Sequence, residues 1–248
     1  MLVDVHTHID FPQFDRDRRD VIKRAEKEKI VIINSGMGSG GMKKTLELIK
    51  EYENVYATFG VSPTEFNEGE IKDCIKLIRD NRDSIVGIGE VGLDYHWIKD
   101  SSERIQEMNN FRGFIDLSNE LNLPLVVHSR GAEGDVIKAL RDSGSKAILH
   151  CFSGSVAQAE EAVKSGNLIS IPASVVYSKQ KQEMVRRIPL KHLVLETDAP
   201  FLSPVPKTRN EPVNIKLSIR KISEVKGVNT SIVEDTTTLN AKKFLNLD

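Results

Sequence analysis

The sequence has few cysteines and no long apolar segment. Only Cys74 and Cys151 occur among 248 residues, too few for a disulfide framework, so we expect a reducing, cytoplasmic environment. No window reaches the roughly 18 apolar residues of a membrane span, and the first residues lack the basic-then-apolar pattern of a signal peptide. We therefore expect no membrane association, and no feature implies an obligate protein partner.

An excess of charge of either sign is also missing. The chain carries 35 Lys and Arg against 36 Asp and Glu, a formal net charge of −1. A protein that coats nucleic acid needs a clear basic excess, so the balance argues against that class. It leaves room for an enzyme that holds a few phosphates locally through metal ions.

Short β-branched segments alternate with longer amphipathic ones from end to end, and no linker or low-complexity tract divides residues 1–248. This alternation predicts parallel strands joined by helices, and eight such units in about 250 residues favour an α/β fold, a single-domain (β/α)8 TIM barrel. An open doubly wound sheet is the competing architecture. The predicted strands are Leu2–Val5, Ile30–Asn34, Val55–Val61, Ile85–Gly89, Pro124–His128, Lys146–His150, Asn167–Ile171 and Leu193–Thr197.

Ionisable residues gather where the predicted strands end. His6 and His8 are two apart on an extended strand, so both imidazoles face the same way. Such a pair alone is a weak sign of metal binding, and two polar residues at an exposed strand end would look the same. Four further residues close other strands, and all these ends open onto one face of a barrel. Together the set predicts a metal site: Glu90, His128, His150 and Asp198 join His6 and His8.

Three other features lie outside this set of six residues. His96 follows Glu90 in the next loop and is expected to line the cleft without binding metal, although a solvated position would fit too. The glycines of 36–41 match a dinucleotide fingerprint only formally, because no acid stands about 20 residues further on; a flexible loop at the barrel mouth is expected instead. The proline-rich stretch Pro200–Pro212 is expected to form a long loop after the last strand.

Taken together, these motifs resemble those of the TatD family of metal-dependent deoxyribonucleases, within the amidohydrolase-like barrels. The resemblance runs through nearly the whole chain, and its motifs identify the family better than they identify what a member cleaves. It is carried by Asp4-Val5-His6-Thr7-His8-Ile9-Asp10, Gly89-Glu90-Val91-Gly92-Leu93-Asp94-Tyr95, Leu123-Pro124-Leu125-Val126-Val127-His128-Ser129-Arg130, His150-Cys151-Phe152-Ser153-Gly154, Leu195-Glu196-Thr197-Asp198-Ala199-Pro200-Phe201-Leu202 and Arg209-Asn210-Glu211-Pro212.

The resemblance implies two divalent metal ions, one held by His6, His8 and Asp198 and the other by His128 and His150, with Glu90 bridging them. Asp198 would also orient or deprotonate the attacking water. Mixed histidine and carboxylate ligands suit Zn, Mn, Co or Fe, and Mg is possible where substrate oxygens help.

Two residues outside the ligand set are expected near the substrate. Arg130 is placed to meet a phosphate with two hydrogen bonds, and a surface salt bridge is its alternative. Glu211 would contact the substrate or form a hydrogen bond to one of the metal-binding side chains. The alternative is that it is a loop residue without a functional role.

Two departures from the family pattern concern the substrate side. Ser62 stands where the family usually has a histidine, and Pro172 stands where it tends to be glycine-rich. Both should border the substrate and leave the metal ligands intact, so they bear on substrate choice and catalytic rate.

The expected activity is hydrolysis of phosphodiester bonds in DNA, as an exonuclease that trims single-stranded or frayed ends. The small net charge gives little long-range attraction to a polyanion, and a narrow cleft suits a strand end better than a rigid duplex. One alternative is an amidohydrolase acting on a small cyclic amide, ester or lactone; such barrels often carry a modified lysine where this chain has Glu90. The other is a non-catalytic binding barrel, which would not need Asp198.

Overall fold

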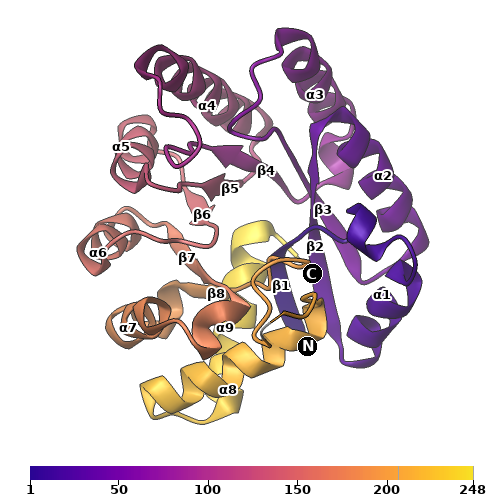
Figure 1. Cartoon of the computed structure of the whole chain (residues 1–248), viewed down its shortest axis with the longest axis vertical. Coiled ribbons are helices and arrows are strands. Elements are labelled where there is room, and N and C mark those ends of the chain that lie inside the picture. Colours follow the sequence, from indigo (N-terminus) through magenta and orange to yellow (C-terminus); the bar gives the residue numbers. More distant parts are fainter. Residues whose placement is uncertain (206, 248) are drawn as a thin grey trace.

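The computed structural model describes residues 1–205 and 207–247. Eight strands, all parallel, follow one another around a single sheet in the order in which they occur in the chain, with helices outside them (Figure 1). A doubly wound sheet would reverse its strand order, so the (β/α)8 barrel prediction is confirmed. The strands are β1 (Leu2–Thr7), β2 (Ile30–Met37), β3 (Val55–Gly60), β4 (Gly87–Gly92), β5 (Leu125–His128), β6 (Ala147–Leu149), β7 (Leu168–Ile171) and β8 (Leu193–Leu195).

The helices follow the apolar periodicity of the sequence. In α5, for example, Val136, Ile137 and Leu140 are buried on the side that packs against the barrel. A capping box between Ser155 and Gln158 begins α6. The helices are α1 (Arg18–Lys27), α2 (Gly38–Glu51), α3 (Glu68–Asp80), α4 (Ser101–Leu121), α5 (Glu133–Ser143), α6 (Val156–Lys164), α7 (Lys179–Arg187), α8 (Ile215–Lys226) and α9 (Thr230–Leu245), with 3-10 turns η1 (Pro12–Phe14), η2 (Arg82–Ser84), η3 (Ala173–Val176), η4 (Leu190–His192) and η5 (Pro212–Asn214).

The barrel closes where the segment after β8 returns to β1. The backbone N–H of Asp198 donates to the carbonyl of His6 (3.0 Å), and that of His8 donates to the carbonyl of Ala199 (2.7 Å). Between them the buried carboxylate of Asp4 accepts a hydrogen bond from the N–H of Thr197 at 2.8 Å. These bonds fix the position of Asp198 relative to the two histidines of the first strand.

One end of the barrel is filled by apolar side chains and covered by α9. Its side chains Ala241 and Leu245 pack against an apolar cluster inside the barrel. Near the strand starts, Asn240 donates to the carbonyls of Leu190 and Leu193 (2.8 and 2.7 Å). The opposite end is left for polar groups. In the apolar cluster that packs against α9, the residues contributed by strands are Val3, Val5, Ile33, Val126, Ile148, Leu168 and Val194.

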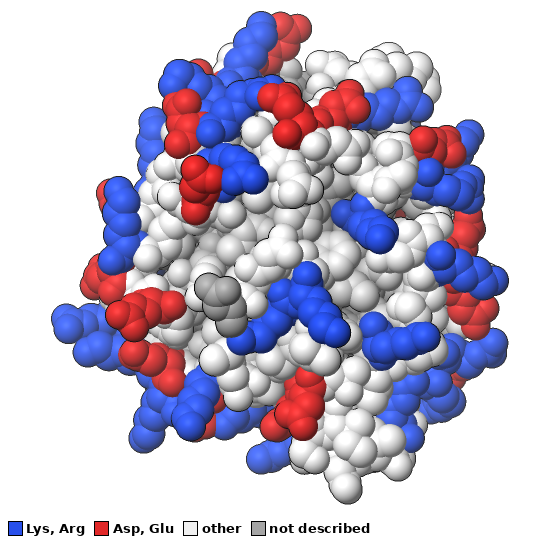
Figure 2. Space-filling model, turned by 180° about the vertical axis from the view of Figure 1, so that it is seen from behind, with Lys and Arg blue, Asp and Glu red and all other residues white. Residues whose placement is uncertain are grey.

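Charged residues of both signs are interspersed around the edge of one face of the molecule (Figure 2). Figure 2 shows this face, from behind the view of Figure 1, with Lys and Arg next to Asp and Glu around the edge and several separate Lys and Arg side chains among uncharged residues towards the centre. This face therefore offers no continuous basic strip for a duplex, in agreement with the near-zero net charge. No helix in residues 1–205 and 207–247 is long and apolar enough to cross a membrane.

Two details of the predicted elements differ in the structure, and one predicted loop is confirmed. Glu90 lies inside β4 rather than after it, because that strand runs two residues later at its start and three later at its end. Residues 36–41 are not a loop: β2 continues to Met37 and α2 begins at Gly38. The loop expected between Pro200 and Pro212 is confirmed for residues 200–205 and 207–211, whereas Pro206 lies outside the described residues.

Candidate metal centre at the carboxyl ends of the strands

The structure brings all six predicted ligands together at the open end of the barrel. His6 lies in β1 and His8 directly after it, His128 is the last residue of β5, and His150 follows β6. Glu90 comes from β4, and Asp198 stands three residues beyond the end of β8. His6, His8, Glu90 and His150 are all at least 93% buried, so the cluster lies at the bottom of the mouth and not on its rim.

The two carboxylate oxygens of Glu90 face different imidazoles. Oε2 lies 3.4 Å from Nε2 of His6 and 3.6 Å from Nε2 of His8. Oε1 lies 2.8 Å from Nδ1 of His128 and 3.6 Å from Nε2 of His150. Glu90 therefore stands between two pairs of imidazole nitrogens, the arrangement that a bridging carboxylate would require.

Asp198 completes the first of these groups. Its Oδ1 lies 3.8 Å from Nε2 of His6 and 3.7 Å from Nε2 of His8, and the two Nε2 atoms are 3.1 Å apart. Ligand atoms that each lie about 2.1 Å from one ion are separated by about 3.0–3.5 Å from one another. The spacing of these atoms matches that of a metal-binding site with little adjustment.

The second group is supported by two carboxylates that the sequence interpretation did not assign. Asp94 accepts a hydrogen bond from Nε2 of His128 (2.9 Å), and Glu196 accepts one from Nδ1 of His150 (3.2 Å). A histidine ligand commonly donates its other N–H to a carboxylate, which orients the ring and makes it more basic. Both acids stand within the family motifs, so a search for such partners near each histidine could have found them.

Close backbone contacts place two of the ligands. A Cβ on Gly60 of β3 would overlap the backbone of Glu90, so the glycine lets β3 approach β4 at that residue. Gly92 has φ +139°, and a Cβ there would overlap the carbonyl of His128. These glycines allow Glu90 and His128 to come from neighbouring strands into one site.

The imidazoles that face Oε1 are strongly influenced by carboxylates. Burial alone would lower the pKa of His128, but hydrogen bonds to Asp94 and Glu90 raise it to about 10. Burial likewise opposes the charges of Glu196 and Glu90 at His150, whose pKa rises to about 9. Burial would raise the pKa of Glu90, yet the surrounding histidines hold it well below its usual range. The carboxylates around His128 and His150 therefore stabilise positive charge, whether a protonated imidazole or a metal ion carries it.

The other half of the site has the opposite character. Burial and the neighbouring His6 lower the pKa of His8 to about 3, and burial also lowers the pKa of His6. Both rings are neutral near pH 7, the form in which imidazole binds metal. Burial raises the pKa of Asp198 to about 7, against the opposing charge of His150.

The donor set fits divalent metal ions. Neutral imidazole nitrogens and carboxylate oxygens are the ligands of zinc, manganese, cobalt and iron sites. Four carboxylates converge here with four imidazoles, and their negative charges need protons on His128 and His150, or metal ions in place of those protons, to balance them: Glu90, Asp94, Glu196 and Asp198. Among the described residues, two groups of three could each hold one ion, because their nitrogen and oxygen atoms all lie within 4.8 Å of one another. One group is His6, Glu90 and His150, and the other is His6, His8 and Asp198.

The three residues predicted to touch substrate have different environments. Arg130 is exposed and lines the cavity beside the cluster. His96 is exposed against the ring of Trp97, with 5.0 Å between ring centroids, and is not among the described residues that line that cavity. Glu211 forms an ion pair with Arg24 of α1 at 2.6 Å. The contact role of Arg130 thus gains support, whereas those of His96 and Glu211 stay predictions without it.

The two departures from the family pattern also have defined places. The hydroxyl of Ser62 lies 2.9 Å from that of Thr64, and Ser62 is not among the described residues that line the mouth cavity. Pro172 is buried and precedes η3, which presents Ser174 to the mouth cavity. Neither supplies a ligand atom in the cluster.

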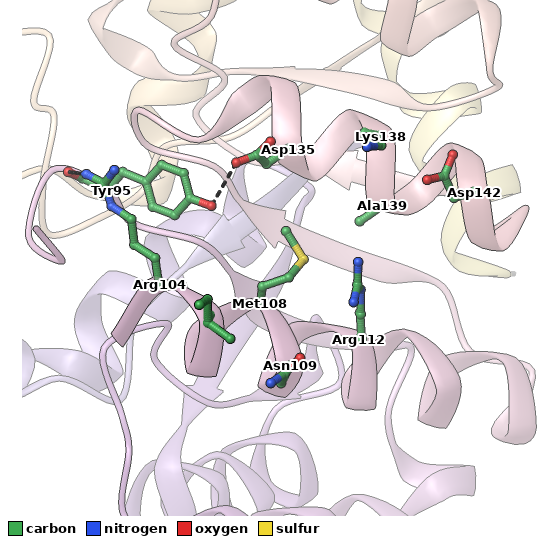
Figure 3. A pocket seen from close by; sticks show the side chains of 10 residues that line it. Tyr95, Arg104, Met108, Asn109, Arg112, Asp135, Lys138, Ala139 and Asp142 are labelled. Carbon is green, nitrogen blue, oxygen red and sulfur yellow. Dashed lines mark hydrogen bonds between the residues drawn. The ribbon is translucent and has the colours of Figure 1, made fainter. Parts of the chain in front are cut away.

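A cavity at the mouth of the barrel is distinct from one on its outside. The mouth cavity, about 410 Å³, includes His128, His150 and Asp198 in its lining. A second, of about 340 Å³, lies between α4 and α5 on the outside of the barrel (Figure 3). There Tyr95 donates a hydrogen bond to Asp135 (2.8 Å), and none of the six predicted ligands takes part in the lining. The mouth cavity is therefore the candidate substrate site.

Comparison with known proteins agrees with this geometry. The family model described as TatD related DNase matches residues 3–246. An uncharacterized metal-dependent hydrolase of Methanocaldococcus jannaschii is 40% identical over 98% of this chain and 96% of its own length. The human deoxyribonuclease TATDN3 is 36% identical over 98% of this chain and 94% of its own length. A TatD homolog of Escherichia coli K12 superposes with a TM-score of 0.90 at 23% identity, covering 100% of this chain and 98% of that one, which shows the shared fold.

Proposed function

The chain belongs to the TatD-related DNase family and is a metal-dependent hydrolase, and on this premise we propose that it is an exonuclease that removes nucleotides from single-stranded or frayed ends of DNA. The same proposal assigns His6, His8 and Asp198 to one ion, His128 and His150 to the other, and the bridge to Glu90. We place the activity in the cytoplasm, which agrees with the free thiols of Cys74 and Cys151.

The observation that carries the proposal is the position of Glu90, whose two oxygens face two separate pairs of imidazoles. A pair of cations held this way would activate water and offset the negative charge that develops on a phosphoryl group. Asp198, on the mouth side of His6 and His8, is placed to orient the attacking water and accept its proton.

The shape and charge of the mouth support a strand end as substrate. The cavity beside the cluster, about 410 Å³, is within the usual size range of small-ligand sites, and it holds Arg130 at its edge. The protein has almost no net charge to attract a duplex from a distance. Capture then depends on short-range contacts, which a flexible single-stranded end can make inside the cavity.

Removal of metal tests the hydrolytic part of the proposal. Chelation should reduce phosphodiester hydrolysis to background, and Mg or Mn added back should restore it, because the substrate phosphate would lose its neutralising cations. Full activity in protein shown to be metal-free by elemental analysis would contradict the proposal. So would turnover of ester substrates with no turnover of any phosphodiester.

A closed circle of single-stranded DNA tests the requirement for an end. The linear form of the same sequence, end-labelled, should be shortened stepwise, and the circle should remain intact over the same time. Cutting the circle as fast as the linear strand would refute end recognition and leave an endonuclease.

A further inference from the structure

Lys181 is a buried cation in the wall of the mouth cavity. It lies on α7, is only 6% exposed, and shares the cavity with His150 and Asp198. Its ammonium donates hydrogen bonds to the backbone carbonyls of Cys151 (3.0 Å) and Phe152. Lysine is rarely buried to this degree without an acidic partner, so its surroundings need an explanation.

No carboxylate among residues 1–205 and 207–247 forms an ion pair with Lys181, and its ammonium donates to the two backbone carbonyls. Carbonyl dipoles orient the ammonium but do not cancel its charge, and a buried charge without a counter-ion is costly. An ammonium has three N–H donors, so one remains beyond the two carbonyls. An anion entering the cavity could accept that hydrogen bond and balance the charge.

The rest of the lining specifies what kind of anion. Arg130 adds a second positive group at the edge, and Phe201, 46% exposed, adds an aromatic ring to the same cavity. A cationic wall next to an exposed ring is suited to a nucleotide, whose phosphate and base need these two kinds of contact. The volume of about 410 Å³ lies within the range of cavities that hold one small molecule.

We propose that Lys181 binds a phosphate group of the substrate next to the one that is cleaved, so that the mouth cavity holds the end nucleotide with its terminal phosphate. The inference rests on the proposed nuclease function, because it takes the metal cluster as the place of the scissile phosphate. Lys181 then determines substrate preference: a strand end that carries a phosphate binds better than one that ends in a hydroxyl.

Thymidine dinucleotides separate this role from cleavage itself. TpT has only the scissile phosphate, whereas pTpT and TpTp carry one more at either end. The wild-type enzyme should cleave one of the two phosphorylated forms with a kcat/KM at least about tenfold above that of TpT, since a hydrogen bond between two charged groups is among the stronger ones. Lys181→Gln should remove this preference, with a loss of kcat/KM on the phosphorylated form at least about tenfold larger than its loss on TpT.

Control variants exclude an effect through folding or metal. Lys181→Arg keeps the charge and should retain the preference, and Lys179→Gln, an exposed residue on the same helix, should behave as wild type. Metal content of Lys181→Gln should equal that of wild type. In metal-free protein, calorimetric titration with inorganic phosphate should show binding that Lys181→Gln weakens about tenfold.

An equal loss on TpT and on the phosphorylated dinucleotides, or loss of metal in Lys181→Gln, would overturn the inference, because Lys181 would then only hold the loop of Cys151. Equal cleavage of all three dinucleotides by wild type would also overturn it. Failure of wild type to cleave any dinucleotide or longer DNA with metal present is a different result, and it would refute the proposed function itself.

Discussion

The two ends of the barrel are made from the same strands but have opposite chemistry. At the covered end, Val3 and Val194 pack with Leu245 of α9 in an apolar cluster. At the open end, β1 carries the buried His6 and the segment after β8 carries the partly buried Asp198, both among other charged groups. Apolar burial stabilises the fold, whereas a cluster of buried charges costs free energy unless cations balance it. Stability and activity should therefore respond separately to changes at the two ends.

The largest loss of activity without a loss of the fold is expected from Glu90→Gln at the open end. The substitution removes the negative charge between the two imidazole pairs, so metal content should fall and hydrolysis should drop by at least about a hundredfold. The circular dichroism spectrum should stay that of wild type. Elemental analysis and kinetics measure the effect, with Glu120→Gln, an exposed residue paired with Arg79, as control. Two metals per chain with full turnover would show that Glu90 is not the bridge.

The opposite result, a loss of stability without a loss of activity, is expected from Leu245→Ala at the covered end. The side chain is 1% exposed, and its truncation should lower the free energy of unfolding by about 2–5 kcal/mol without altering metal content or kcat. Urea unfolding measures the loss. Leu239→Ala on the same helix, where the leucine is 51% exposed, should stay within about 0.5 kcal/mol of wild type. A large loss of kcat in folded Leu245→Ala would mean that the two ends are coupled.

A smaller effect, on metal affinity, is expected from Glu196→Gln, which changes the carboxylate next to His150. Glu196 accepts hydrogen bonds from His150 (3.2 Å) and from the N–H of Cys151 (2.8 Å), so we expect it to orient His150, one of the predicted ligands. Its loss should weaken metal affinity about ten- to hundredfold, as measured by competition with a chelating dye. Glu161→Gln, on the surface of α6, provides the control. Unchanged affinity would remove Glu196 from the support of the site.

The smallest effect is expected at the rim, from Arg130→Ala. The side chain is exposed, so its phosphate contact is partly screened by solvent, and KM for an oligonucleotide should rise only a few-fold. Metal content should not change, because no ligand is touched. Kinetics at two salt concentrations measure the effect, and Arg141→Ala on α5 serves as control. Loss of metal in Arg130→Ala would show that the residue supports the cluster and does not meet the substrate.

Local patterns were sufficient for much of the architecture. The β-branched segments predicted all eight strands in order, with ends displaced by a few residues. The displacement mattered at β4, where Glu90 is part of the strand. It mattered again at residues 36–41, where glycines suggested a loop but the backbone passes directly from β2 into α2. Ends are hard to predict because pairing with a neighbouring strand, and not the segment itself, decides where a strand stops.

By itself the sequence determined that six ligand-type residues would meet at one end of a barrel, because parallel strands place their carboxyl ends on the same face. Only the tertiary structure decided the partners of those residues. Packing between elements distant in the chain directed the two oxygens of Glu90 to different imidazoles, and it paired Glu211 with Arg24. It also buried Lys181 beside the cluster. Such pairings join residues far apart in the chain, and a periodicity of two or 3.6 residues carries no information about them.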